Sequence, residues 1–148
     1  ISIDIKTIKF CDELLLKKLA KFVELKEYIT GKKKEIGLDN KKLKINQEDL
    51  VASGLTNVGL FRQYIFNYLK DHKGIRDDLT FLIRQLQPGQ SGLPIEIYVF
   101  TNDTDWVNYE NIQSDIFDHL LAVLPAFDLS AFQIISDNND QVKRIKDK

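Results

Sequence analysis

Asp115 and His119 are the clearest pair of side chains with metal-binding spacing, four residues apart on one expected helix. Residues at i and i+4 share a helical face, so a carboxylate and an imidazole there could both reach one metal ion. A helical metal site needs further ligands that converge on the same point, and the sequence supplies none. We therefore interpret the pair as part of an ordinary solvated helical edge and expect neither a metal nor a cofactor.

The other residues whose types are used in catalysis or phosphate binding lack the neighbours that such sites need. Cys11 lacks the neighbours of a nucleophile, and a buried thiol is its more common role. Asp77 and Asp78 precede a strand and fit a turn, while Gly89 and Gly92 are typical of a hairpin rather than a phosphate-binding loop. The sequence contains no P-loop, nucleophile elbow or dinucleotide fingerprint. It therefore favours a protein that is not an enzyme.

The composition is that of one globular domain. The 148 residues are 43% apolar and 29% charged, with a formal net charge of −1. A nearly neutral chain argues against a nucleic-acid binder that relies on bulk positive charge, and a single cysteine excludes a disulfide framework within the chain. No apolar run approaches the roughly 18 residues of a membrane span. The chain begins at Ile1 without an initiator Met, so we expect it to be cut from a longer protein.

Hydrophobic periodicity predicts the elements that must position these residues. Alternation with a period of two indicates strands, and apolar spacings of three and four indicate helices. The expected elements are, in chain order, a strand over 1–10, a helix over 12–31, a helix beginning at Thr56 or Asn57, strands over 79–87 and 93–101, a helix from Thr104 or Asp105 to Pro125, and a strand over 129–135.

This order predicts an α+β fold of the ferredoxin-like βαββαβ type, a sandwich of a four-stranded antiparallel sheet with two helices on one face. Residues 12–54 are an extra helical and Lys-rich insertion after the first strand. Its second part, 32–54, is interpreted as a solvated linker, with contact to anionic lipid or nucleic acid as the alternative. The α/β domain then spans 1–135, and 136–148 form a polar C-terminal tail.

A hairpin that closes symmetrically near Gln90 sets the register of the two central strands. It places Leu82 opposite Tyr98, and Arg84 opposite Glu96 as a cross-strand ion pair. The face expected to lie under the helices carries the following residues: Phe81, Ile83, Gln85, Ile95, Ile97 and Val99.

The opposite, outer face is less polar than a solvated sheet needs. It carries Leu82, Tyr98 and Phe100, with Phe132 from the last strand, and we expect these four residues to form an interface. Three interpretations are open: the domain oligomerises through this face, the insertion folds back over it, or its aromatic residues stack RNA bases. Asp4, on the outer face of the first strand, would repel phosphate and argues against RNA.

Several strings in the chain resemble MscS-type mechanosensitive channels, particularly the larger, mini-conductance subgroup. Residues 55–62, LTNVGLFR, resemble the family's LTN-x-G-x-FR stretch. The hairpin strings LIRQL at 82–86 and GLPIEIYVFTN at 92–102 are similar to that subgroup's hairpin, and DIFDHLLAVLP at 115–125 is similar to its closing helix. The resemblance runs from Ile1 to about Gln133.

The resemblance implies a cytoplasmic C-terminal domain that forms part of a vestibule below a homo-heptameric pore in the bacterial inner membrane. In that family, membrane tension opens the pore, and ions and small solutes leave the cell during hypo-osmotic shock. The implied partners are identical subunits, with no nucleic acid, and with membrane contact only through segments absent from this chain. The alternative is a free-standing ferredoxin-like regulatory module that binds a small ligand or RNA through its sheet.

Overall fold

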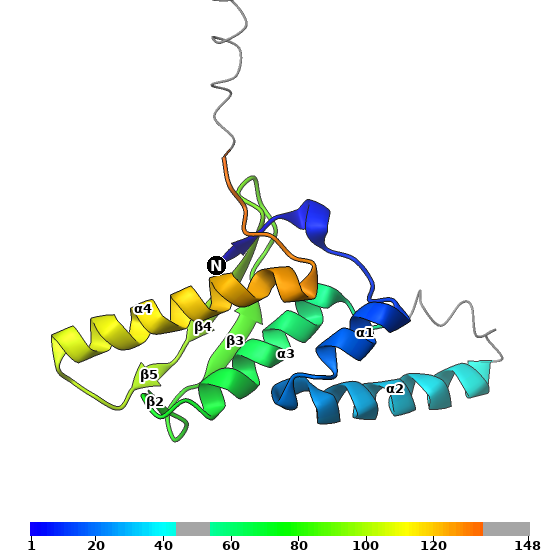
Figure 1. Cartoon of the computed structure of the whole chain (residues 1–148), viewed down its shortest axis with the longest axis horizontal. Coiled ribbons are helices and arrows are strands. Elements are labelled where there is room, and N and C mark those ends of the chain that lie inside the picture. Colours follow the sequence, from blue (N-terminus) through cyan, green and yellow to red (C-terminus); the bar gives the residue numbers. More distant parts are fainter. Residues whose placement is uncertain (44–53, 135–148) are drawn as a thin grey trace, which may run out of the picture.

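The computed structural model describes the backbone of residues 1–43 and 54–134, and the side chains of 1–36 and 54–134. The expected mixed α+β class is confirmed (Figure 1). The elements are β1 (Ser2–Ile3), η1 (Ile5–Thr7), α1 (Glu13–Leu19), α2 (Val23–Leu43), α3 (Asn57–Lys70), β2 (Ile75–Arg76), β3 (Leu82–Gln85), β4 (Leu93–Tyr98), β5 (Phe100–Thr101), α4 (Trp106–Val123) and η3 (Leu124–Phe127).

The main sheet has the strand order β1–β4–β3, with antiparallel neighbours. The strand expected at 129–135 is reduced, in its described part, to one antiparallel bridge between Ala131 and Ile3. Beside that bridge, the Phe132 amide donates to the Ser2 carbonyl over 2.9 Å. The described residues thus form three strands and a bridge rather than the predicted four-stranded sheet. A separate two-stranded sheet, β2 with β5, was not predicted because its strands have only two residues each.

The predicted register of the hairpin is confirmed across all of β3. Leu82 lies opposite Tyr98, Ile83 opposite Ile97, and Arg84 opposite Glu96. The expected ion pair forms between Arg84 Nε and Glu96 Oε2 at 2.5 Å. The same register would next pair Phe81 with Val99 and Thr80 with Phe100, but the ladder ends at Leu82–Tyr98 and Phe100 pairs with Arg76 instead.

The turn of this hairpin depends on Gly92. Its φ of +85° lies in the region that favours glycine, and a Cβ there would lie 2.3 Å from the Ile3 carbonyl oxygen. Gly89 and Gly92 close the turn with two backbone hydrogen bonds of 3.0 and 3.1 Å. Gly92, one of the two glycines expected in the turn, therefore allows β1 to approach β4.

The first strand is much shorter than predicted. After Ile3, the Asp4 side chain accepts a hydrogen bond from the Lys6 amide, and the Thr7 hydroxyl donates to the Asp4 carbonyl. These local bonds favour the 3-10 turn η1 over continued pairing, as Asp and Thr often do. The strand predicted over 1–10 from its alternating pattern is therefore wrong beyond residue 3.

The insertion is helical over more of its length than predicted. The single helix expected over 12–31 is two helices, since the chain turns at Ala20–Phe22 and Phe22 packs edge-on against Tyr64. The second helix, α2, passes Gly31 without ending, and a Cβ at Gly31 would meet no atom within 4 Å. Residues 32–43 are thus helix rather than linker, and the rest of that prediction, 44–53, lies outside the described residues.

The predicted helix starts are confirmed. The Asp12 carboxylate caps α1 by accepting from the Leu15 amide, the Thr56 hydroxyl caps α3, and the Asp105 carboxylate caps α4. Of the two residues considered for the α3 cap, Thr56 fills that role. Asn57 is instead fully buried, and its side chain joins three segments of the chain.

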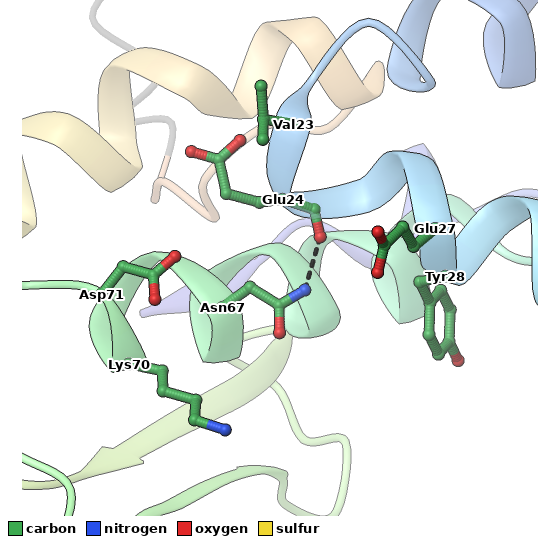
Figure 2. Close-up of a pocket in the computed structure, with 7 residues that line it drawn as sticks. All are labelled: Val23, Glu24, Glu27, Tyr28, Asn67, Lys70 and Asp71. Carbon is green, nitrogen blue, oxygen red and sulfur yellow. Dashed lines mark hydrogen bonds between the residues drawn. The ribbon is translucent and has the colours of Figure 1, made fainter.

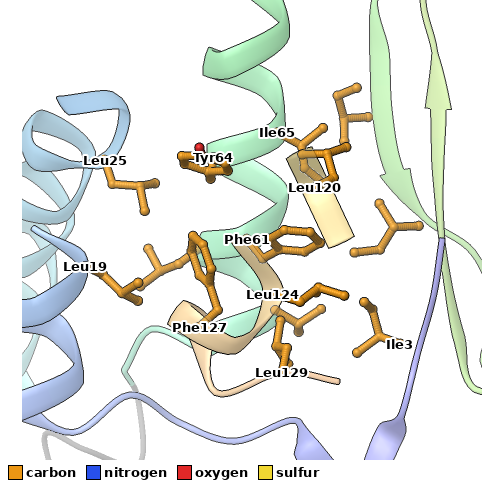
Figure 3. Packing of buried hydrophobic residues seen from close by; sticks show 14 of the residues in the cluster. Ile3, Leu19, Leu25, Phe61, Tyr64, Ile65, Leu120, Leu124, Phe127 and Leu129 are labelled. Carbon is orange, nitrogen blue, oxygen red and sulfur yellow. The ribbon is translucent and has the colours of Figure 1, made fainter. Parts of the chain in front are cut away.

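The core lies between the sheet and the helices and includes the insertion. Figure 3 shows Phe61 and Tyr64 of α3 between Leu19 and Leu25 on one side and Leu120 on the other. Phe127 of η3 packs against Phe61, with ring centroids 5.3 Å apart. The insertion therefore contributes to the same core as the rest of the domain.

Candidate functional site

The outer face of the main sheet brings three of the four predicted interface residues together. Leu82 lies directly opposite Tyr98, and the Tyr98 ring meets the Phe100 ring edge-on with centroids 5.5 Å apart. Their exposed fractions are 39% for Leu82, 50% for Tyr98 and 39% for Phe100. Large apolar side chains grouped on a sheet surface at this exposure are typical of an interaction site.

Phe132 does not lie with the other three. Its amide bonds to Ser2 of β1, and its Cβ lies 3.1 Å from the position a Cβ would take at Gly92. Phe132 is thus half-buried near the turn of the hairpin, whereas Tyr98 lies at the far end of β4. We call Leu82, Tyr98 and Phe100 the sheet-face patch, and the role of Phe132 stays a prediction.

The described part of the insertion does not cover the sheet-face patch. Helix α2 packs along α3, on the side of the sheet that holds the core. The alternating burial of the strands agrees, since Ile83 and Ile95 are buried on the core side. Within the described residues, the outer face is therefore open.

His119 belongs to an aromatic cluster between α3 and α4. Its Nε2 lies 2.7 Å from the Tyr64 hydroxyl, and its ring stacks on Tyr68 with centroids 4.1 Å apart. Burial raises the pKa of Tyr64 to about 12, so this phenol keeps its proton and can donate it to Nε2. No group of three or more potential metal ligands occurs in the described parts of the chain.

Cys11 is buried between α1 and the start of α3. Burial raises the pKa of its thiol to about 11, first by desolvation and then through the neighbouring Asp12 carboxylate. A thiol that stays protonated at neutral pH is a poor nucleophile, which agrees with the structural role expected for it.

A groove between α2 and α3, with a volume of about 420 Å³, was not visible in the sequence (Figure 2). Its side chains come from positions about 40 residues apart, so no local spacing could indicate it. At this groove, a hydrogen bond from the Asn67 side-chain amide to the Glu24 carbonyl joins α3 to α2. The lining residues are Val23, Glu24, Glu27, Tyr28, Asn67, Lys70 and Asp71.

A family model that describes the C-terminal domain of the mechanosensitive ion channel MscS matches residues 1–131. No solved structure matches. In the parts of the chain that the structure describes, no helix is long and apolar enough to cross a membrane.

Because the match covers most of its length, the chain belongs to the MscS C-terminal domain family, as the resemblance suggested. Membership in this family associates it with mechanosensitive channels, which are membrane proteins assembled from several subunits. The matched region contains the sheet-face patch and the insertion.

Proposed function

We propose that this chain is a cytoplasmic vestibule domain of a tension-gated channel in the bacterial inner membrane, and that it has no enzymatic activity. In this proposal, seven copies surround the path by which ions and small solutes leave the cell after hypo-osmotic shock. The family match over residues 1–131 is the observation that carries it.

The sheet-face patch supports a contact in such an assembly. Three large apolar side chains are exposed on the sheet face opposite the core. Burying them against another subunit or another domain would remove their apolar surface from water, at roughly 25 cal/mol per Å². We propose that Leu82, Tyr98 and Phe100 make this contact.

The ferredoxin-like topology is also a proposal. Ala131 bridges β1 on the side opposite β4, so the neighbours run from the 131 segment through β1 and β4 to β3. An edge strand formed around Ala131 would complete the four-stranded antiparallel sheet.

Patch-clamp recording of the natural protein that contains this chain tests the function. We expect suction on membrane patches to open discrete conductance steps that are absent from cells without the protein. Patches that stay silent under tension up to membrane rupture, with the protein present in the membrane, would refute the channel proposal.

The contact is tested with the double variant Tyr98→Asp, Phe100→Asp, which places two charges on the patch. We expect fewer assembled channels or a shifted tension threshold, because a buried carboxylate without a partner is strongly unfavourable. Ile5→Asp with Leu79→Asp is the matched control, since both side chains are similarly exposed elsewhere. Unchanged assembly and threshold in the patch variant would show that this assignment is wrong.

A further inference from the structure

Charge is divided sharply along the chain. Residues 1–84 contain 17 Lys and Arg against 12 Asp and Glu, a net charge of +5. Residues 85–134 contain seven Asp and Glu and no Lys or Arg, a net charge of −7. The overall charge near zero therefore hides two strongly charged parts, which carry complementary fields.

The negative part presents an acidic flank on α4, defined here as Trp106, Glu110, Phe117, Asp118 and Leu121. The spacings place these residues beside the face of Ile116 and Leu120, which are buried in the core. Trp106 is 72% exposed, and Phe117 and Leu121 are also exposed. The flank is separate from the side of α4 that contacts α3, where His119 meets Tyr64 and Tyr68.

The positive part presents a basic flank on α1 and the turn that follows it, defined here as Leu14, Lys17 and Lys21. Leu14 is 79% exposed. In the described part of the chain, neither of these two lysines forms an ion pair. Both flanks thus combine exposed apolar side chains with charge, and the two charges have opposite sign.

The two flanks lie on different elements of the helical layer. Helix α2 packs against α3, while α4 contacts α3 through His119. Helix α1, which carries most of the basic flank, packs against α2 and η3. In Figure 1, α1 and most of the length of α4 lie apart, so the two flanks are different surfaces of one copy.

We infer that the acidic flank of one copy docks on the basic flank of the next copy, an inference that rests on the oligomeric channel proposed above. A closed ring of more than two identical copies needs a contact between two different surfaces of the subunit. Lysine side chains suit this contact, because their aliphatic stems cover apolar surface and their ammonium groups pair with carboxylates or with the Trp106 face. Contact between two copies of the same flank would instead oppose like charges.

Disulfide crosslinking tests the contact in the natural protein, in a cysteine-free background that includes Cys11→Ser. One variant carries both Leu14→Cys and Leu121→Cys, and two matched controls carry one of these substitutions each. We expect mild oxidation to give a covalent ladder of two or more copies with the double variant only. Strong dimer bands from either single variant would show a contact between identical surfaces and overturn the inference.

Charge exchange gives an independent readout of the same ladder. We expect Lys17→Glu with Lys21→Glu to reduce the crosslinked fraction severalfold, and Glu110→Lys with Asp118→Lys to do the same. Because the combined four-residue variant exchanges the two signs, it should restore the ladder. Lys6→Glu with Lys73→Glu, two exposed lysines outside the basic flank, should leave it unchanged.

The outcomes separate this contact from channel function. Tension-gated conductance from an assembled protein without a ladder would overturn the contact and leave the proposed function intact. A ladder without tension-gated conductance would support the contact and refute the function. If Lys17→Glu with Lys21→Glu abolished binding to phosphatidylserine vesicles and no ladder formed, the basic flank would belong to an anionic membrane surface, and the inference would be overturned.

Discussion

Asn57 joins three parts of the chain through one side chain. Its Oδ1 accepts hydrogen bonds from the amides of Lys9 and Val58, and its Nδ2 donates to the carbonyls of Thr7 and Phe127. These partners come from the segment after β1, the start of α3, and η3. Such a fully satisfied buried amide fixes how the segments meet.

We expect Asn57→Ala to lower the free energy of unfolding by about 2–4 kcal/mol, because it leaves buried backbone groups without partners. Urea denaturation followed by circular dichroism measures the change. Asn111→Ala, at an exposed position of α4, is the control and should stay within about 0.5 kcal/mol of the parent. A loss below about 1 kcal/mol in Asn57→Ala would mean that water replaces the amide.

The Cys11 thiol makes stability depend on alkaline pH. Its pKa is about 11 in the folded chain against a reference value of 9.0, so the unfolded chain loses the proton first. Its contribution is complete below pH 9 and is lost as the pH rises toward 11, by at most about 3 kcal/mol.

Comparing the parent with Cys11→Ala in urea at pH 8, 9, 10 and 11 isolates this effect. We expect the difference in unfolding free energy between the two proteins to shrink steadily from pH 9 to 11. A difference that stays constant over this range would contradict a protonated, buried thiol.

At the scale of elements, sequence patterns located helices better than strands. Asp12, Thr56 and Asp105 marked helix starts because capping is local to three or four residues. The end of β1 was missed because local bonds of Asp4 compete with strand pairing. The sheet-face patch was predictable in part, since the hairpin register determines which side chains share a face, but Phe132 depends on distant pairing with β1.

Gly31 shows why a helix stop signal failed. An exposed glycine inside a helix costs only about 1 kcal/mol relative to alanine, which neighbouring residues can offset. The Lys32–Glu35 ion pair, at 2.7 Å, is one such local contact in α2.

We therefore expect Gly31→Ala to stabilise the protein by about 0.5–1 kcal/mol, since the new methyl group meets no atom within 4 Å. Thermal unfolding should show a higher midpoint for the variant. Gly92→Ala is the opposite control, because a positive φ and the nearby Ile3 carbonyl make it destabilising. A lower midpoint for Gly31→Ala would show that the helix does not continue through residue 31.

At the scale of the whole molecule, net charge was a poor guide to electrostatics. A value of −1 conceals the contrast between residues 1–84 and 85–134, and the fold places the acidic flank on α4 and the basic flank on and just after α1. The groove between α2 and α3 likewise arises only from packing, because its lining residues are distant in sequence.

The charge contrast predicts salt dependence for the contact between flanks. Raising the salt concentration from about 0.05 to 0.5 M shortens the screening length severalfold, so we expect the Leu14→Cys, Leu121→Cys ladder to weaken. Assembly through the sheet-face patch should respond much less, since its residues are uncharged. An increase in the ladder with salt would indicate that apolar burial, rather than charge, dominates the flank contact.

The bridge between β1 and the last described segment has a mechanical consequence. The two segments are antiparallel, so the start of the chain at Ile1 and the exit at Phe132 lie at the same end of their pairing. A force that separates these two points would open the Phe132–Ser2 bond first and the Asp4–Ser130 bond next, as in a zipper. On its other side, Ile1 exchanges two hydrogen bonds with Ile95, so the same pull would leave β1 attached to β4 and detach only the outer segment.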